Sequence, residues 1–110
     1  MNMCIFCQII NKEIPTQFVF EDEKLVAFKD INPKAPVHLL IVPKKHIESV
    51  AKLAETDKIL IGEMIWRAKI LAEKEGIADK GYKLIFNCGE HGGQLVKHIH
   101  LHLLGGKKLE

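Results

Sequence analysis

The stretch that most constrains the fold is "KHIHLHLLGG", Lys97–Gly106, in which every second residue from His98 to His102 is histidine. The chain has six histidines, and this stretch holds half of them, at His98, His100 and His102. Side chains alternate between the two faces of a β-strand. A strand over Val96–Leu104 would therefore place the three imidazoles on one face, ~6–7 Å apart. The apolar residues between them would face a hydrophobic core.

Electrostatic repulsion limits how this row of imidazoles is protonated. Two imidazolium ions at that spacing repel by roughly 2–3 kcal/mol at an effective dielectric constant of about 20, which is enough to move a pKa by more than one unit. At neutral pH the row is therefore not fully protonated. A neutral imidazole is a competent nucleophile, and a protonated neighbour can act as an acid or bind an anion.

Two other interpretations of the row stay open at this point. The histidines can form the polar outer face of an amphipathic strand, although a solvated face more often uses Lys, Glu or Thr. They can also hold a metal ion, because a His-x-His pair can ligate zinc from one strand. The segment "LLGG" that follows supplies no further ligand.

The segments around this stretch predict an antiparallel α+β fold. Apolar residues at helical spacing predict a short helix over Cys4–Asn11 and a long helix over Asp57–Glu75 that starts at Thr56 as N-cap. Short apolar and β-branched runs predict five strands, at Phe18–Glu21, Lys24–Asp30, Val37–Pro43, Tyr82–Asn87 and Val96–Leu104. Hairpin-like connections favour antiparallel pairing of these strands.

Length and composition narrow the class of protein. We expect a single domain over residues 1–110, and 47% hydrophobic with 27% charged residues is typical of a globular chain. A net charge of +2, with scattered lysines and the single arginine Arg67, argues against nucleic-acid binding through a basic patch.

The sequence also predicts a cytoplasmic protein with no membrane partner. No apolar run approaches the ~20 residues of a membrane span. The start "MNMCIFCQII" lacks the features of a signal peptide. An odd number of cysteines, three in all, does not suggest a disulfide framework and fits a reducing compartment.

A glycine-rich turn, "GEHGGQ" at Gly89–Gln94, lies just before the histidines. Its backbone N–H groups can face an anion, although glycines in a turn usually serve the turn geometry. Next to the histidine row, this turn favours recognition of a phosphate group.

The segment "HIHLHLL", residues 98–104, matches the pattern His-φ-His-φ-His-φ-φ, where φ is hydrophobic. With it, Lys12–Ile47 and Asn87–Gly106 resemble the histidine triad (HIT) superfamily, and most closely its Hint-like branch, the purine nucleoside phosphoramidase type. The similarity extends from about Cys4 to Gly106.

This resemblance implies a fold, an activity and partners. The HIT fold is an antiparallel five-stranded sheet with one long and one short helix, and the sheets join across a homodimer. The implied activity is that of a nucleotide hydrolase or transferase, acting at the α-phosphorus of purine nucleoside phosphoramidates without a catalytic cofactor. Two alternatives stay open: a dinucleoside polyphosphate hydrolase, and a nucleotide-binding regulatory or adaptor protein with little turnover.

The resemblance also implies a different role for each histidine of the site. His100, the middle histidine, would be the nucleophile that forms a nucleotidyl-histidine intermediate. His102 would contact the phosphate oxygens and the leaving group. The backbone carbonyl of His98 would hold the ring of His100 in the attacking tautomer. His38 would support the proton network as a fourth histidine.

The nucleotide pocket is likewise implied residue by residue. The residues that would enclose the base are Ile5, Phe6, Ile9, Phe28 and Leu40. Asp30 would accept hydrogen bonds from the ribose, with Ile31 at the nucleoside pocket. Around the phosphate the resemblance places Asn87, Gly93 and Gln94, beside His100 and His102. From the residues alone, the apolar positions are equally typical of plain core, and Asp30 of a turn before "NP".

The sequence departs from the family pattern at one position. Many members carry a serine after the "GGQ" of the glycine-rich turn, where it can donate to the phosphate or the leaving group. Leu95 stands there in this chain and has no donor in its side chain.

The pair Cys4 and Cys7 is close enough to share a metal ion but needs two further ligands. The resemblance supplies them as His46 and His98, which gives a possible structural zinc site with no open coordination position. The alternative is two reduced cysteines packed as small hydrophobic side chains. Cys88 is expected to be buried at the end of a strand.

Overall fold

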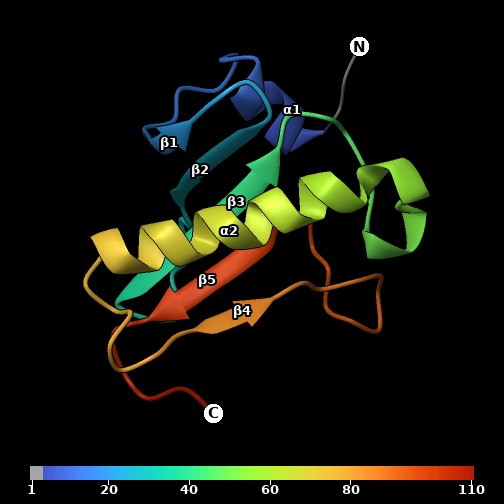
Figure 1. Ribbon diagram of the computed structural model, residues 1–110. Helices are drawn as coiled ribbons and strands as arrows, with labels where there is room; N and C mark the ends of the chain where they lie inside the picture. The colour runs from blue at the N-terminus through green and yellow to red at the C-terminus, as the bar shows by residue number, and fades with distance from the viewer. Residues whose placement is uncertain (1–3) are drawn as a thin grey trace.

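The computed structural model describes residues 4–110, and it shows a five-stranded antiparallel sheet with two α-helices (Figure 1). In chain order the elements are α1 (Ile5–Ile10), β1 (Phe18–Glu21), β2 (Leu25–Lys29), β3 (Val37–Pro43), two short 3-10 turns (Val50–Lys52 and Glu55–Asp57), α2 (Lys58–Lys74), β4 (Lys83–Ile85) and β5 (Leu101–Gly105). The strand order is β1-β2-β3-β5-β4, which confirms the predicted α+β class with one long helix.

The two helices pack on opposite faces of the sheet. The long helix α2 lies across β3 and β5 (Figure 1). Its Met64, Ala68 and Leu71 form a core with one set of alternating strand residues, among them Leu39, Ile41, Leu101 and Leu103. The short helix α1 covers the other set: Phe6 and Ile9 pack with Phe28 and Leu40. The alternation of a β-strand thus divides the apolar residues between two cores.

The strand register places a histidine within the α1 face of the sheet. In the central strand β3, Leu40 lies opposite Phe28 of β2 on one side and His102 of β5 on the other. His38 lies two residues before Leu40 and therefore faces the same side. The sheet thus brings His38 and His102 together beneath the short helix.

The last strand is shorter than the sequence predicts, since β5 begins at Leu101 and not at Val96. The chain before it leaves the ladder because its polar groups have other partners. The N–H of Ile99 donates to the Ile47 carbonyl at 2.7 Å, and the ring of His98 bonds to Pro43 O at 2.8 Å. The prediction of one uninterrupted strand carrying all three histidines was therefore wrong.

Two smaller predictions also differ from the structure. Thr56 lies inside the 3-10 turn, and α2 begins at Lys58, because Asp57 Oδ2 accepts from the Ala54 N–H at 2.8 Å and stabilises the turn that precedes the helix. Cys88 is exposed rather than buried, since β4 already ends at Ile85. Among residues 4–110, none of the helices is long and apolar enough to span a membrane.

Candidate active site

The ring of His100 is buried next to the rings of Phe6 and His102, and a backbone carbonyl holds it. Its Nδ1 lies 2.7 Å from the His98 carbonyl oxygen, and the Phe6 ring meets it edge-on with centroids 5.0 Å apart. Since a carbonyl oxygen can only accept, Nδ1 carries the proton and Nε2 of the neutral ring keeps its lone pair. Burial lowers the pKa of His100, which favours this neutral form.

His102 and His38 form a hydrogen-bonded pair next to Asp30. His38 Nε2 lies 2.9 Å from His102 Nδ1 and 3.4 Å from a carboxylate oxygen of Asp30. On the other side of the ring, the Lys34 backbone N–H donates to His38 Nδ1 at 3.1 Å. Burial lowers the pKa of His38, and it lowers the pKa of His102 to about 4 with a further contribution from His100.

The trio of Asp30, His38 and His102 has the residue types of a metal site, and its ligand atoms lie within 4.8 Å of one another. The Lys34 N–H, however, occupies the lone pair of His38 Nδ1, so the proton of the neutral ring must be on Nε2. A protonated Nε2 cannot bind a metal ion. The arrangement is therefore that of a hydrogen-bonded network rather than of a metal centre.

The four residues expected at the zinc site do meet in the structure. Cys4, Cys7, His46 and His98 each offer one ligand atom, and these atoms all lie within 4.8 Å of one another. Cys4 is the N-cap of α1 and Cys7 lies in its first turn, while His46 follows β3 and His98 precedes β5. Burial lowers the pKa of His98 to about 4.

The separations within this cluster match those of a tetrahedral ion. With Zn–S of ~2.3 Å and Zn–N of ~2.05 Å, tetrahedral angles give S···N separations of ~3.6 Å and N···N separations of ~3.4 Å. The Sγ–Nδ1 distances are 3.3 Å for Cys7–His46, 3.4 Å for Cys4–His98 and 3.5 Å for Cys7–His98, and the two Nδ1 atoms are 3.1 Å apart. His98 Nε2 donates to Pro43 O, which leaves the Nδ1 lone pair facing the cluster. These residues fit a four-coordinate structural zinc ion.

Most of the residues expected at the nucleoside pocket lie together, while two of them are exposed. One buried cluster between α1 and the sheet contains Phe6, Ile9, Phe28 and Leu40. Val96, which the sequence did not single out, packs against it. Ile5 is 47% exposed and Ile31 is 91% exposed. The remaining predicted residue, Asp30, accepts from the Asn32 N–H at 2.8 Å, so its turn-forming role is also present.

The glycine-rich turn is organised by side-chain amides. Asn87 Nδ2 donates to Gly92 O at 2.7 Å. Gln94 Oε1 accepts from the Gly89 N–H at 2.9 Å, and Gln94 Nε2 donates to Val96 O at 2.9 Å. Gly93 has a φ of 75°, a conformation that favours glycine. The predicted phosphate residues are thus linked within one turn, and Leu95 behind it is 93% exposed.

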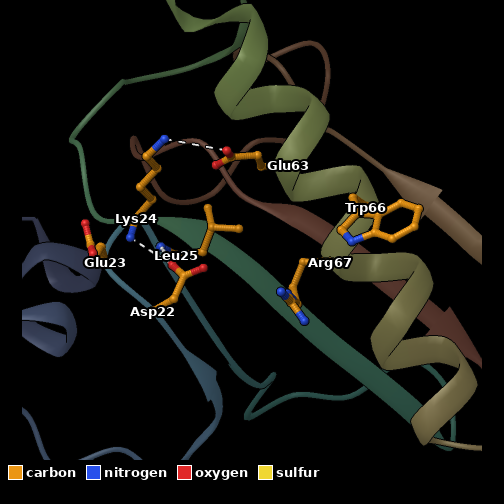
Figure 2. Close-up of a pocket in the computed structure, with 7 residues that line it drawn as sticks. All are labelled: Asp22, Glu23, Lys24, Leu25, Glu63, Trp66 and Arg67. Carbon is orange, nitrogen blue, oxygen red and sulfur yellow. Dashed lines mark hydrogen bonds and ion pairs between the residues drawn. The ribbon is translucent and has the colours of Figure 1, made fainter.

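Another hollow, between α2 and the turn that joins β1 to β2, has different chemistry (Figure 2). Its lining contains no histidine and consists of Asp22, Glu23, Lys24, Leu25, Glu63, Trp66 and Arg67. Lys24 pairs with Glu63 at 3.5 Å, and Arg67 lies over the Phe20 ring at 3.8 Å. Because no histidine lines this hollow, the histidine site remains the candidate active site.

A buried neutral imidazole whose Nε2 keeps a lone pair has the chemistry that a histidine nucleophile requires. The family model described as "Scavenger mRNA decapping enzyme C-term binding" matches residues 3–109. The chain is 49% identical over 105 residues to the purine nucleoside phosphoramidase of Escherichia coli K12, covering 96% of this chain and 88% of that protein. It is 48% identical over 107 residues to a 14 kDa zinc-binding protein of Zea mays, covering 96% and 83%.

Among solved structures, a HIT family hydrolase from Legionella pneumophila Philadelphia 1 is 50% identical. It superposes with a TM-score of 0.95 and covers 97% of this chain and 96% of that one. The chain belongs to the histidine triad (HIT) family.

Proposed function

We propose that this chain is a purine nucleoside phosphoramidase that acts through a nucleotidyl-histidine intermediate on His100. The observation that carries this proposal is the 2.7 Å bond from His100 Nδ1 to the His98 carbonyl, because it directs the lone pair to Nε2. The 49% identity to a purine nucleoside phosphoramidase over nearly the whole chain supports the same reaction.

The reaction proceeds as two displacements at the α-phosphorus. His100 Nε2 attacks phosphorus and the P–N bond of the substrate breaks, so that the amine leaves with the electron pair and takes up a proton from the solvent. Water then attacks phosphorus and gives a proton to the solvent, the bond to His100 breaks, and the nucleoside monophosphate is released. Replacing one difficult step by two easier ones is ordinary covalent catalysis. The His98 carbonyl stabilises the positive charge that the ring gains in the first step.

The nucleotide is held on either side of this nucleophile. The apolar cluster of Phe6, Ile9, Phe28 and Leu40 encloses the base, and the exposed Ile5 and Ile31 close over it. Asp30 accepts from the ribose hydroxyls. His102, with the turn residues Asn87, Gly93 and Gln94, contacts the phosphate oxygens.

A structural zinc ion at Cys4, Cys7, His46 and His98 is part of the proposal, since the donor set and its spacing fit such an ion. With four protein ligands, zinc would supply a folding constraint and no catalytic position. The relevance to the reaction is that His98 belongs to both sites. Its ring faces the two sulfur atoms, while its carbonyl orients His100.

We further propose a homodimer in which the sheets of two copies join. The edge strand β4 has a half-exposed Leu84, and α2 presents the apolar side chains of Ile59, Ile65 and Trp66 to the outside. An open sheet edge and exposed apolar helix residues are each typical of a surface that another chain covers. Sedimentation of the purified chain tests this, and a monomer at micromolar concentration contradicts it. The single domain over 1–110 and the cytoplasmic location stay predictions.

A substrate panel tests the proposed reaction against its two alternatives. We expect rapid release of the amine from a fluorogenic adenosine phosphoramidate, and much slower cleavage of a dinucleoside polyphosphate. Preferred cleavage of the dinucleotide would instead indicate a polyphosphate hydrolase. Tight binding of AMP without turnover of either compound would indicate a nucleotide-binding adaptor.

A further inference from the structure

The loop between β2 and β3 places one backbone amide against the ring of a buried histidine. The Lys34 N–H donates to His38 Nδ1 at 3.1 Å. A backbone amide can only donate, so Nδ1 must present a lone pair to it. A doubly protonated ring would bring two N–H groups face to face. This contact therefore selects the neutral tautomer of His38 that carries its proton on Nε2.

The other side of the same ring leads independently to that tautomer. His38 Nε2 is 3.4 Å from a carboxylate oxygen of Asp30, and an ionised carboxylate only accepts. The nearer neighbour of Nε2 is His102 Nδ1 at 2.9 Å. With the proton on His38 Nε2, this hydrogen bond runs from His38 to His102. His102 Nδ1 is then an acceptor, and the proton of its neutral ring lies on Nε2.

We propose that the Lys34 amide, acting through His38, fixes His102 as an Nε2–H hydrogen-bond donor toward the phosphoryl group of the substrate. The proposal rests on the proposed function and deepens it, because it gives the protons of the site a definite order. His100 presents a lone pair at Nε2 and His102 presents a proton at Nε2. One ring can attack phosphorus while its neighbour stabilises the charge on the phosphoryl oxygens.

A consequence is that His38 is a positioning residue and not a proton relay. A relay would need His38 to receive a proton at Nδ1 as it gives one away at Nε2. The group at Nδ1 is an amide N–H that has no proton to transfer at neutral pH. His38 therefore holds the tautomer of His102 and keeps its own proton throughout the reaction.

Nitrogen NMR of the histidine rings tests the tautomers without substrate, in the chain labelled with ¹⁵N-histidine and with its metal bound. We expect His38 and His102 each to show a protonated Nε2 and an unprotonated Nδ1 at neutral pH. In Lys34→Pro, which removes the amide hydrogen, the Nδ1-protonated tautomer should appear at both rings. Lys34→Ala keeps the amide and should give the wild-type spectrum. A proton on His102 Nδ1 in the wild type, or identical spectra for the two Lys34 variants, would overturn the proposal.

Kinetics of two isosteric variants separates positioning from relay. His38→Gln can place an amide N–H donor where Nε2 lies, whereas His38→Glu places an acceptor there and would force His102 to protonate Nδ1. We expect kcat/KM for the phosphoramidate to be at least ~10-fold higher in His38→Gln than in His38→Glu, the size of one lost hydrogen bond. Equal values in the two variants would refute the positioning role. The NMR result stands apart from turnover, so it would survive if the substrate proved to be another nucleotide.

Discussion

The two ends of the segment His98–His102 carry the same residue type and use it in opposite ways. At one end, His98 donates from Nε2 to the Pro43 carbonyl and turns its Nδ1 lone pair toward Cys4 and Cys7. At the other end, His102 accepts at Nδ1 from His38, which leaves its proton on Nε2. Between them, His100 has its proton on Nδ1 and its lone pair on Nε2.

The repeat of histidines therefore does not by itself determine the chemistry of each ring. All three rings have a lowered pKa, chiefly through burial, so all three favour the neutral form. What separates them is the single partner on one side of each ring. For His98 and His100 this partner is a backbone carbonyl, and for His102 it is His38, which the Lys34 amide fixes in turn. The partner decides which ring nitrogen is available to the metal, to phosphorus or to the phosphate oxygens.

The largest effect is expected from His100→Ala, because this change removes the Nε2 lone pair that we propose attacks phosphorus. We expect the phosphoramidase turnover to fall by ~10³-fold or more, with AMP still bound, as measured by fluorogenic assay and calorimetry. His91→Ala is the matched control, since His91 is exposed and belongs to neither histidine cluster. Turnover by His100→Ala close to that of the wild type would contradict the assignment.

Cys7→Ser tests the proposed zinc site at the His98 end of the segment. Cys7 Sγ contacts both His46 and His98. A metal ion that binds only the folded chain stabilises the folded state directly. We expect loss of zinc by elemental analysis and a decrease of about 3 kcal/mol or more in the free energy of unfolding. Cys88→Ser changes an exposed thiol outside the cluster and serves as control.

Wild-type protein, purified without a polyhistidine tag, provides the decisive check of this prediction. It should contain close to one zinc per chain and lose stability on treatment with a chelator. Zinc-free protein whose unfolding is insensitive to chelators would refute the metal site while leaving the account of His100 intact.

The lowered pKa of His102, at the other end of the segment, predicts how the free energy of unfolding depends on pH. Burial and the neighbouring His100 lower the pKa of His102 from 6.5 to about 4. Between these two values the unfolded chain binds more protons than the folded chain, so stability rises with pH and is lost as pH falls from 6.5 toward 4. Denaturant unfolding at several pH values should show this decline. In His102→Gln the decline should be shallower, and an unchanged slope would contradict the buried neutral ring.

The smallest effect is expected from Leu95→Ser. Leu95 is 93% exposed, so its replacement should change the free energy of unfolding by less than about 0.5 kcal/mol. A hydroxyl behind the glycine-rich turn would add a donor for the phosphate or the leaving amine, and we expect kcat/KM to rise by roughly 2–10-fold. Steady-state kinetics with the phosphoramidate measures this change, and a decrease in kcat/KM would show that Leu95 itself serves the substrate.

The sequence predicts the order of helices and strands well because hydrophobic periodicity reports which face of an element is buried. It places β3 at Val37–Pro43 with the observed bounds. The segment Val96–His100 is mispredicted as a strand. Its apolar residues do alternate, but its backbone hydrogen bonds lie outside the sheet, as the bond from the Ile99 N–H to the Ile47 carbonyl shows. Alternation alone cannot distinguish a strand from an extended segment outside the ladder.

Two backbone groups of the site are not revealed by the sequence. The carbonyl of Pro43 and the N–H of Lys34 fix the tautomers of His98 and His38, yet every residue has a carbonyl and nearly every residue an N–H. The third backbone group, the His98 carbonyl that orients His100, was implied by the family resemblance alone. No residue type marks such a position. The exposure of Cys88 was not predicted either, because β4 ends at Ile85 and leaves Cys88 outside the strand.

The most direct test of the central claim is the stereochemical course at phosphorus. The substrate would be an adenosine phosphorothioamidate of known configuration, hydrolysed in ¹⁸O-labelled water. Two successive in-line displacements, first by His100 and then by water, each invert the phosphorus centre. We therefore predict net retention of configuration in the product. Net inversion would mean that water attacks the substrate in one step, and it would contradict the nucleotidyl-histidine intermediate.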